Sequence, residues 1–305
     1  MNSLVALSAL IEQMANTSGS AEALTGQAMS SALQAKIVTR QVAQNFRIDP
    51  QAHLESTVQK LMEDPVTYAE IPLRNVGPAE LNAKAKGLCT QFGELAAKYP
   101  FNPNATREAT LQELNAIFQP QQGALWTFYD ANLKSLLNRQ GSQFAIKTDA
   151  AISINPAFVN FWNNAAAFTD AIYPENSAQP HLAYTLRPSR PDGVENVTLT
   201  IDGQTVAADA NAVPRALVWS GNPNSEVKLT GGTGLAYTGL WSAFKFFGDA
   251  DRWTRSGTGY TAEWNLRLGR ATPLTFRFEL DMGKAAPVFQ KNFLSNLKCV
   301  AEIVR

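Results

Sequence analysis

The apolar residues of this chain change their spacing near residue 175, and this change constrains the fold more than any other feature of the sequence. Before it, apolar side chains recur every three or four residues, as they do between Leu81 and Leu95. From His181 onward they alternate with polar ones, as in Leu182 to Arg187. Helices repeat every 3.6 residues and strands every two, so the pattern predicts a helical half followed by a β half.

The predicted fold class is α+β in two segments. Residues 1–175 are expected to form a helical bundle, and residues 176–305 a small antiparallel β-sandwich with a short internal helix and a C-terminal helix. Tyr173-Pro174 and the polar residues that follow are typical of a domain boundary. The clean alternation of several strands favours a sheet with one dry and one wet face.

Prolines and capping residues predict where the helices begin and end. Asp49-Pro50 and Asn155-Pro156 each place a capping side chain before a proline at the first helical position. Asp64-Pro65 is expected to end one helix, and Pro78 to begin the next. Thr110 and Glu113 have the spacing of a capping box.

The β half contains equally local signals. Asp202-Gly203 predicts a tight hairpin turn. Two later segments, 260–268 and 274–280, alternate apolar and polar residues as half-buried strands do. Phe289, Phe293 and Leu297 are spaced as on a closing helix.

The segment from Leu217 to Asp249 combines two short apolar strands, a glycine-rich reversal at 231–234 and a brief aromatic helix. Trp219 and Trp241 are expected in the core. Apart from a weak acidic pair at its end, Asp249-x-Asp251, this segment offers no nucleophile, base or metal ligand, so it indicates packing and not a reaction.

The same segment carries a family resemblance. It contains Trp219-Ser220-Gly221 and then Gly239-x-Trp241-x-x-Phe244-Lys245, ending at Asp249. Together with flanking motifs, this order resembles the C-terminal part of the IcmF/TssM family, the inner-membrane scaffold of type VI secretion, from about Val42 to the end. The flanking motifs are Tyr99-Pro100-Phe101, Gln119 to Gly123, Trp126-x-Phe128, Phe276-x-Phe278 and Cys299. Three departures are Ser220 where the family usually has Pro, Lys245 where it has Arg, and Val300 where it has Pro.

The resemblance implies a structural protein that is not an enzyme. It implies the periplasmic, soluble part of an inner-membrane-anchored chain that bridges the two membranes by binding the outer-membrane lipoprotein TssJ. It further implies binding to the inner-membrane TssL through the full-length protein, and homo-oligomers in the assembled complex. Among exposed loop tips, Asn222, Asn224 and Trp253 are the candidate partner-binding residues. The alternative function is a periplasmic carbohydrate- or peptidoglycan-binding module that stacks sugars on exposed aromatics.

Composition and motifs argue against other classes. Basic and acidic residues number 26 each, so no general attraction to nucleic acid is expected. No apolar run approaches the ~18 residues of a membrane span. The two histidines, His53 and His181, lie in different halves, and no phosphate-binding loop or nucleophile motif is present. No catalytic, metal or cofactor site, and no small-molecule substrate, is therefore expected.

The sequence leaves the state of its two cysteines open. Cys89 lies in a helical segment beside Leu88, which favours a buried free thiol over a disulfide with Cys299. A periplasmic location would permit the bridge without requiring it.

Overall fold

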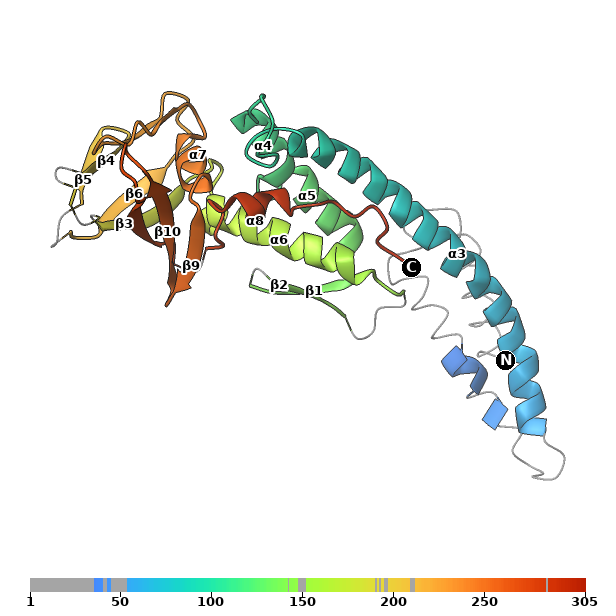
Figure 1. Cartoon of the computed structure of the whole chain (residues 1–305). Helices are drawn as coiled ribbons and strands as arrows, with labels where there is room; N and C mark the ends of the chain where they lie inside the picture. Colours follow the sequence, from blue (N-terminus) through green and yellow to red (C-terminus); the bar gives the residue numbers. More distant parts are fainter. Residues whose placement is uncertain are drawn as a thin grey trace.

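The computed structural model describes residues 36–40, 43–44, 54–141, 143–147, 152–189, 191, 193–194, 197–208, 212–283 and 285–305. It has a helical half, with the long helix α3, and a two-sheet β half beside it (Figure 1). The predicted α+β class is confirmed. His53 and the predicted helix start at Asp49-Pro50 lie outside the described residues.

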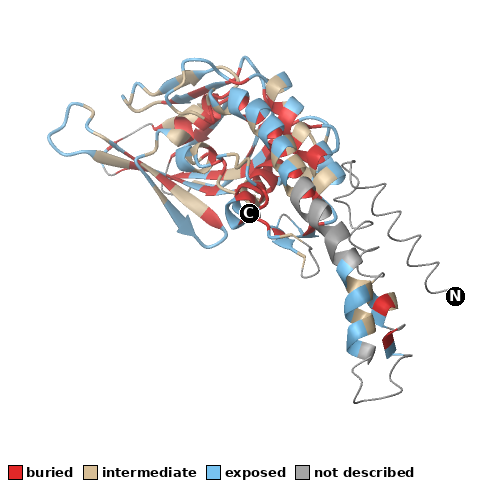
Figure 2. Ribbon diagram, turned by 90° about the vertical axis from the view of Figure 1, so that its right-hand side faces the viewer, coloured by how far each residue is buried: buried red, intermediate tan, exposed pale blue. Residues whose placement is uncertain are grey.

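Helix α3 runs without interruption over Leu54–Ala96. The predicted end at Asp64-Pro65 and the predicted start at Pro78 are therefore wrong. A proline inside a helix removes one backbone hydrogen bond and strains one turn, but the turns on either side can continue the helix. The predicted apolar face of its last turns is confirmed, because Leu81, Ala85, Leu88, Phe92 and Leu95 are all buried. Its first described turns are largely exposed (Figure 2).

Short helices cover the buried face of α3. They are α4 (Leu111–Phe118), α5 (Ala124–Phe128) with its continuation η2 (Tyr129–Leu133), and α6 (Pro156–Ile172). The predicted capping box is confirmed, since Thr110 and Glu113 bond reciprocally. The Lys98 ammonium and the Thr110 backbone N–H bond the Glu113 carboxylate and hold its pKa below the ordinary 4.5. The Asn155 cap is confirmed as well, because its Oδ1 accepts from Ala157 N at 3.0 Å.

A β-hairpin interrupts the helical half, where only helices were expected. Strands β1 (Leu137–Gln140) and β2 (Gln143–Ile146) pair with each other and lie against α6. The Asn163 side chain of α6 bonds both backbone groups of Phe144, with Oδ1 accepting at 2.6 Å and Nδ2 donating at 3.1 Å. The hairpin depends on this contact with another element, which the short polar strands do not reveal by themselves.

After the one-turn helix η3 (Pro174–Asn176), the β half forms two antiparallel sheets. The first has the order β6-β3-β11-β10-β9 and the second the order β5-β4-β7-β8. The first sheet contains β3 (Leu182–Ser189), β6 (Arg215–Trp219), β9 (Arg252–Ser256), β10 (Gly259–Leu266) and β11 (Leu274–Asp281). The second contains β4 (Thr198–Ile201), β5 (Gln204–Ala207), β7 (Glu226–Leu229) and β8 (Ala236–Thr238).

The predicted alternation holds along the strands. In β3, Leu182, Tyr184 and Leu186 are buried while the residues between them are exposed or half-buried. The Asp202-Gly203 turn is confirmed between β4 and β5, with both residues at positive φ. The glycines at 231–234 reverse the chain between β7 and β8, also at positive φ.

Helix α7 (Ser242–Gly248) is the internal helix, and its aromatic side chains fill the sandwich. Phe246 stacks on Trp264 of β10, with ring centroids 4.7 Å apart. Trp219 of β6 stacks on Trp241, which precedes α7, at 5.2 Å. The predicted core positions of both tryptophans are confirmed, since Trp219 is 2% exposed and Trp241 0%.

Trp241 also joins the two halves. Its indole N–H donates to the backbone carbonyl of Ala109, just before α4, at 2.7 Å. Beside it, Lys245 of α7 forms an ion pair with Glu108. One cluster of buried apolar residues therefore continues from the helical half into the sandwich. The boundary at residue 175 marks the change from helices to strands, and its role as a domain limit stays a prediction.

The predicted C-terminal helix is confirmed, but it is shorter than expected. Helix α8 covers only Lys291–Ser295, so Phe289 and Leu297 lie outside it, although both are buried. After α8 the chain runs without a helix along the helical half toward α3 (Figure 1). This path overturns the prediction of a free Cys89 thiol, because Cys299 arrives with its Cα 5.3 Å from that of Cys89 and the two form a disulfide.

We call the contacts of Trp241 and Lys245 with Ala109 and Glu108 the joint between the halves. Replacement of Trp241 tests this joint. We expect Trp241→Ala to lower the free energy of unfolding by about 3–5 kcal/mol, because it leaves a large cavity. Trp241→Phe keeps most of the ring but leaves the Ala109 carbonyl unpaired, and we expect a loss of about 1–3 kcal/mol. The exposed Val218→Ala serves as control with a change below about 0.5 kcal/mol. Equal urea midpoints for all three variants would contradict this role.

Candidate interaction surface

The acidic pairs Asp249-x-Asp251 and Glu279-x-Asp281 have separate hydrogen-bond and ion-pair partners. Asp249 accepts from the Tyr237 hydroxyl at 2.8 Å and faces Lys291, whereas Asp251 accepts from the backbone N–H of Asn265 at 2.6 Å. Glu279 pairs with Arg187, and Asp281 accepts from Gly283 N. Among the described residues, no three His, Cys, Asp or Glu side chains gather as metal ligands would. These carboxylates fix loops and strands.

Burial raises the pKa of several tyrosines. Tyr99, near the joint between the halves, has a raised pKa because of burial and then because of the nearby Asp249 and Glu108 carboxylates. Burial also raises the pKa of Tyr184, whose hydroxyl has no partner among the described residues. Each of these phenols therefore stays protonated near neutral pH, and its ring packs in the core or against the joint.

The predicted contact residues Asn222 and Asn224 lie on the loop that connects the two sheets, between β6 and β7. Both are exposed. Asn222 Oδ1 accepts from Asn224 N at 2.9 Å, a local turn that fixes the loop. The preceding Gly221 has φ +70° and packs closely on Leu111 of α4. The loop is thus an ordered projection beside the joint.

Trp253, the third predicted contact residue, lies in edge strand β9 and is half-buried. Its indole N–H donates to the Phe247 carbonyl at 3.2 Å, and its ring contacts Phe247 and Tyr260. Only part of the ring is therefore open to a partner. Strands β6 and β9 form opposite edges of the same sheet, so the structure does not bring Trp253 together with the asparagine loop.

A groove between the halves escaped the sequence analysis, because its lining comes from five separate segments. It has a volume of about 1220 Å³ and lies between α6, the β1–β2 hairpin and the first sheet. Much of its lining is small, which keeps the groove open: Ala167, Ala171, Ala183, Ala285 and Ala286. Such a space suits an extended segment of another protein.

Arg139 forms one wall of this groove. Its guanidinium lies over the Trp126 and Phe144 rings, 5.1 and 5.5 Å from their centroids, and donates to Asp170 of α6 at 3.2 Å. Burial raises the pKa of Asp170, and Arg139 opposes that rise. Arg255 lies on the opposite wall and is exposed.

The exposed face of the first sheet carries polar ladders in place of aromatic rings. Arg277 pairs with Glu263 at 2.7 Å, and Thr275 bonds Asn265 at 2.8 Å. Trp264 and Phe276, which the carbohydrate-binding alternative would need on this face, are buried at 2% and 0% exposure. Within these five strands, all of whose residues are described, the exposed face thus offers no platform on which a sugar could stack.

The family model for the type VI secretion protein IcmF helical domain matches residues 80–178. The Type VI secretion system component TssM1 of Pseudomonas aeruginosa is 28% identical over 169 residues. That alignment covers 52% of this chain and 15% of the relative, so the chain spans only a small part of that protein.

Solved structures share the fold. A chain of a type VI secretion system membrane core complex superposes with a TM-score of 0.72 at 18% identity, over 97% of this chain and 61% of its own length. The C-terminal domain of the T6SS protein TssM from EAEC gives 0.60 at 21% identity, over 75% of this chain and 99% of its own length. Together the matches confirm the resemblance to the IcmF/TssM family. Among the described residues, no helix combines the length and apolar character that a membrane crossing requires.

Substitution of Arg139 tests the wall of the groove. Arg139→Met removes the cation beside Asp170, so the pKa of Asp170 should rise further above its ordinary 3.8. A carboxylate with a raised folded-state pKa destabilises the fold only where it is ionised. The variant should therefore be less stable than the parent at pH 7, by about 0.5–1 kcal/mol, and the charge-dependent part should vanish below about pH 3.9. NMR titration of Asp170 with urea unfolding measures both, and an unmoved Asp170 pKa would contradict the pairing.

Proposed function

We propose that this chain, a relative of the IcmF/TssM proteins, is a structural component of the type VI secretion membrane complex. In this proposal it is the region that bridges the inner and outer membranes by binding an outer-membrane lipoprotein. The observation that carries the proposal is the fold likeness to a membrane core complex chain over 97% of the present chain. The family match over the helical half supports it.

We place the chain in the periplasm, as the soluble part of an inner-membrane-anchored protein. The disulfide between Cys89 and Cys299 supports this location, because disulfides persist in oxidising compartments such as the bacterial periplasm. The near-zero net charge also suits contact with proteins better than contact with nucleic acid or anionic lipid.

The partners in this proposal are the lipoprotein TssJ, bound directly, the inner-membrane TssL, bound elsewhere in the full-length protein, and further copies of the chain. The β half, residues 176–305, is the proposed lipoprotein-binding domain, and residues 1–175 are the proposed helical domain. The exposed loop at Asn222 and Asn224 is well placed for contact, since its backbone is fixed before binding and little ordering is required. Trp253 adds a half-exposed ring at the other edge of the sheet.

In this proposal the chain is a rigid scaffold that exposes binding surfaces to partner proteins, and we assign it no enzyme activity. The large side chains support that assignment, because Trp219, Trp241 and Phe244 are buried and pack on one another. A partner-binding protein needs such a rigid support for its exposed loops.

Binding of the complete chain to purified TssJ, followed by calorimetry, tests the function. We expect a saturable complex whose dissociation constant rises at least about tenfold, or 1.4 kcal/mol, in Asn224→Arg. This change leaves the Asn222 side chain and its turn bond in place. Trp253→Phe should weaken binding less, because much of the ring is already covered.

The matched control is Gln122→Arg, which adds the same charge at an exposed position of the helical half. No binding by the parent would overturn the proposed function. Binding that survives in Asn224→Arg would refute only the loop assignment.

A further inference from the structure

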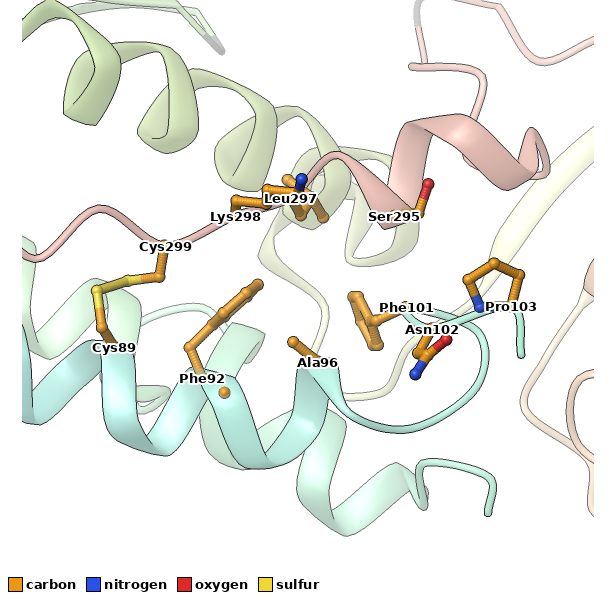
Figure 3. Close-up of a pocket in the computed structure, with 11 residues that line it drawn as sticks. Cys89, Phe92, Ala96, Phe101, Asn102, Pro103, Ser295, Leu297, Lys298 and Cys299 are labelled. Carbon is orange, nitrogen blue, oxygen red and sulfur yellow. A yellow bond between two sulfur atoms is a disulfide. The ribbon is translucent and has the colours of Figure 1, made fainter. Parts of the chain in front are cut away.

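The Cys89–Cys299 disulfide borders a cavity of about 380 Å³ between α3 and the C-terminal segment. Figure 3 shows the sulfur–sulfur bond at one end of this space, with Phe92 and Phe101 along it and Lys298 and Leu297 on the opposite side. The bond links residues 210 positions apart, so it ties the C-terminal segment to the long helix α3.

We call residues 296–305 the C-terminal strap. Its last residues are held by two asparagines of the helical half. Asn82 of α3 accepts from the backbone N–H groups of Ile303 and Val304, at 2.8 and 3.0 Å, and donates to the Val304 carbonyl at 3.0 Å. Asn155, the cap of α6, donates through its backbone N–H to the Ile303 carbonyl at 2.7 Å and through Nδ2 to that of Glu302 at 2.9 Å.

The middle of the strap is attached differently. All strap residues are described, and Cys299, Val300 and Ala301 form no hydrogen bond with another described element. Val300 and Cys299 are only half-buried against the core. The disulfide is therefore the principal attachment between Leu297, which is buried beside α8, and the asparagine-bound end.

The bond is within reach of solvent. Cys89 and Cys299 are both half-buried, and two of the residues that line the cavity, Gly93 and Lys298, are exposed. Gly93 lies one helical turn after Cys89 and therefore on the same face of α3. A Cβ added at Gly93 would meet no atom within 4 Å, so the absence of a side chain leaves this approach open.

We propose that the Cys89–Cys299 disulfide is a redox modification site that a small dithiol reaches through this cavity. Its reduction frees the middle of the strap. One thiolate of the dithiol attacks a sulfur of the bridge, the sulfur–sulfur bond breaks, and the other cysteine leaves as a thiolate that takes up a proton. The second thiol of the reductant then resolves the mixed disulfide. The products are two cysteine thiols and the oxidised, disulfide form of the reductant.

Reduction changes the strap locally. The hydrogen bonds of Asn82 and Asn155 remain, and the contacts of Trp241 and α7 do not involve either cysteine. The region near Cys299 becomes free to leave α3, while the sandwich and the helical core keep their packing. The disulfide thus decides how firmly the middle of the strap is fastened to the long helix, while its last residues stay bonded to Asn82 and Asn155.

The rate of reduction tests the access route. The folded, complete chain is treated with dithiothreitol, and free thiols are counted by mass spectrometry after alkylation. We expect Gly93→Trp to slow reduction at least tenfold, because the indole fills the approach. Gly87→Trp is the matched control: it adds the same ring to α3, on another face, where a Cβ also meets nothing within 4 Å. It should react at the parent rate.

Equal rates in Gly93→Trp and the parent would overturn the proposed route. A parent that is reduced only as fast as it unfolds globally would overturn the proposal as a whole. Circular dichroism checks that each variant is folded. Gly93→Leu, whose side chain is smaller than an indole, is the second variant, and its disulfide should be reduced at an intermediate rate.

Backbone NMR order parameters of the oxidised and reduced parent test the consequence. Reduction should lower the order parameters of residues 298–301 below about 0.6, the range of a flexible backbone, and leave those of strands β10 and β11 near about 0.85. Unchanged order parameters in the strap would contradict its release. A general fall that includes β10 and β11 would show that the disulfide supports the whole fold and would contradict a local change.

Discussion

The contact of Trp241 with both halves of the chain is the interaction on which the rest of the structure depends. The indole stacks on Trp219 of the first sheet, contacts Phe244 of α7, and donates its N–H to the Ala109 carbonyl of the helical half. A buried indole N–H without a partner costs free energy, as does a buried carbonyl without a donor, so this hydrogen bond stabilises both groups. The Trp241 indole and the Ala109 carbonyl can form this bond only when the sandwich is docked on the helices. The docking of the two halves and the packing of the core around Trp241 therefore depend on each other.

Three further connections reinforce this contact, two beside Trp241 and one at a distance. Beside Trp241, Lys245 pairs with Glu108, and the Gly221 turn packs on Leu111. At a distance from it, the strap carries the chain from α8 back to α3 and is held there by the disulfide and two asparagines. The exposed loop at Asn224 and the groove near Arg139 therefore lie on two halves that are connected at several points.

Sequence reasoning succeeded where the determining information is local. Thr110 and Glu113, Asn155-Pro156 and Asp202-Gly203 each act within a few residues, and the alternation in β3 and β11 follows directly from a sheet with one dry face. It failed where distant residues decide. Helix α3 continues through Pro65, the β1–β2 hairpin relies on Asn163, and Cys89 meets a residue 210 positions away. The groove is hidden for the same reason, whereas the exposure of Asn222 and Asn224 agrees with their loop composition.

Equilibrium unfolding followed by hydrogen exchange of α6 and β11 in increasing denaturant tests the central claim most directly. If the aromatic joint unites helices and sandwich, the buried amides of both elements should open with the same free energy and the same denaturant dependence. Early opening of β11, while α6 remains protected, would contradict the account, because the halves would then be separate bodies.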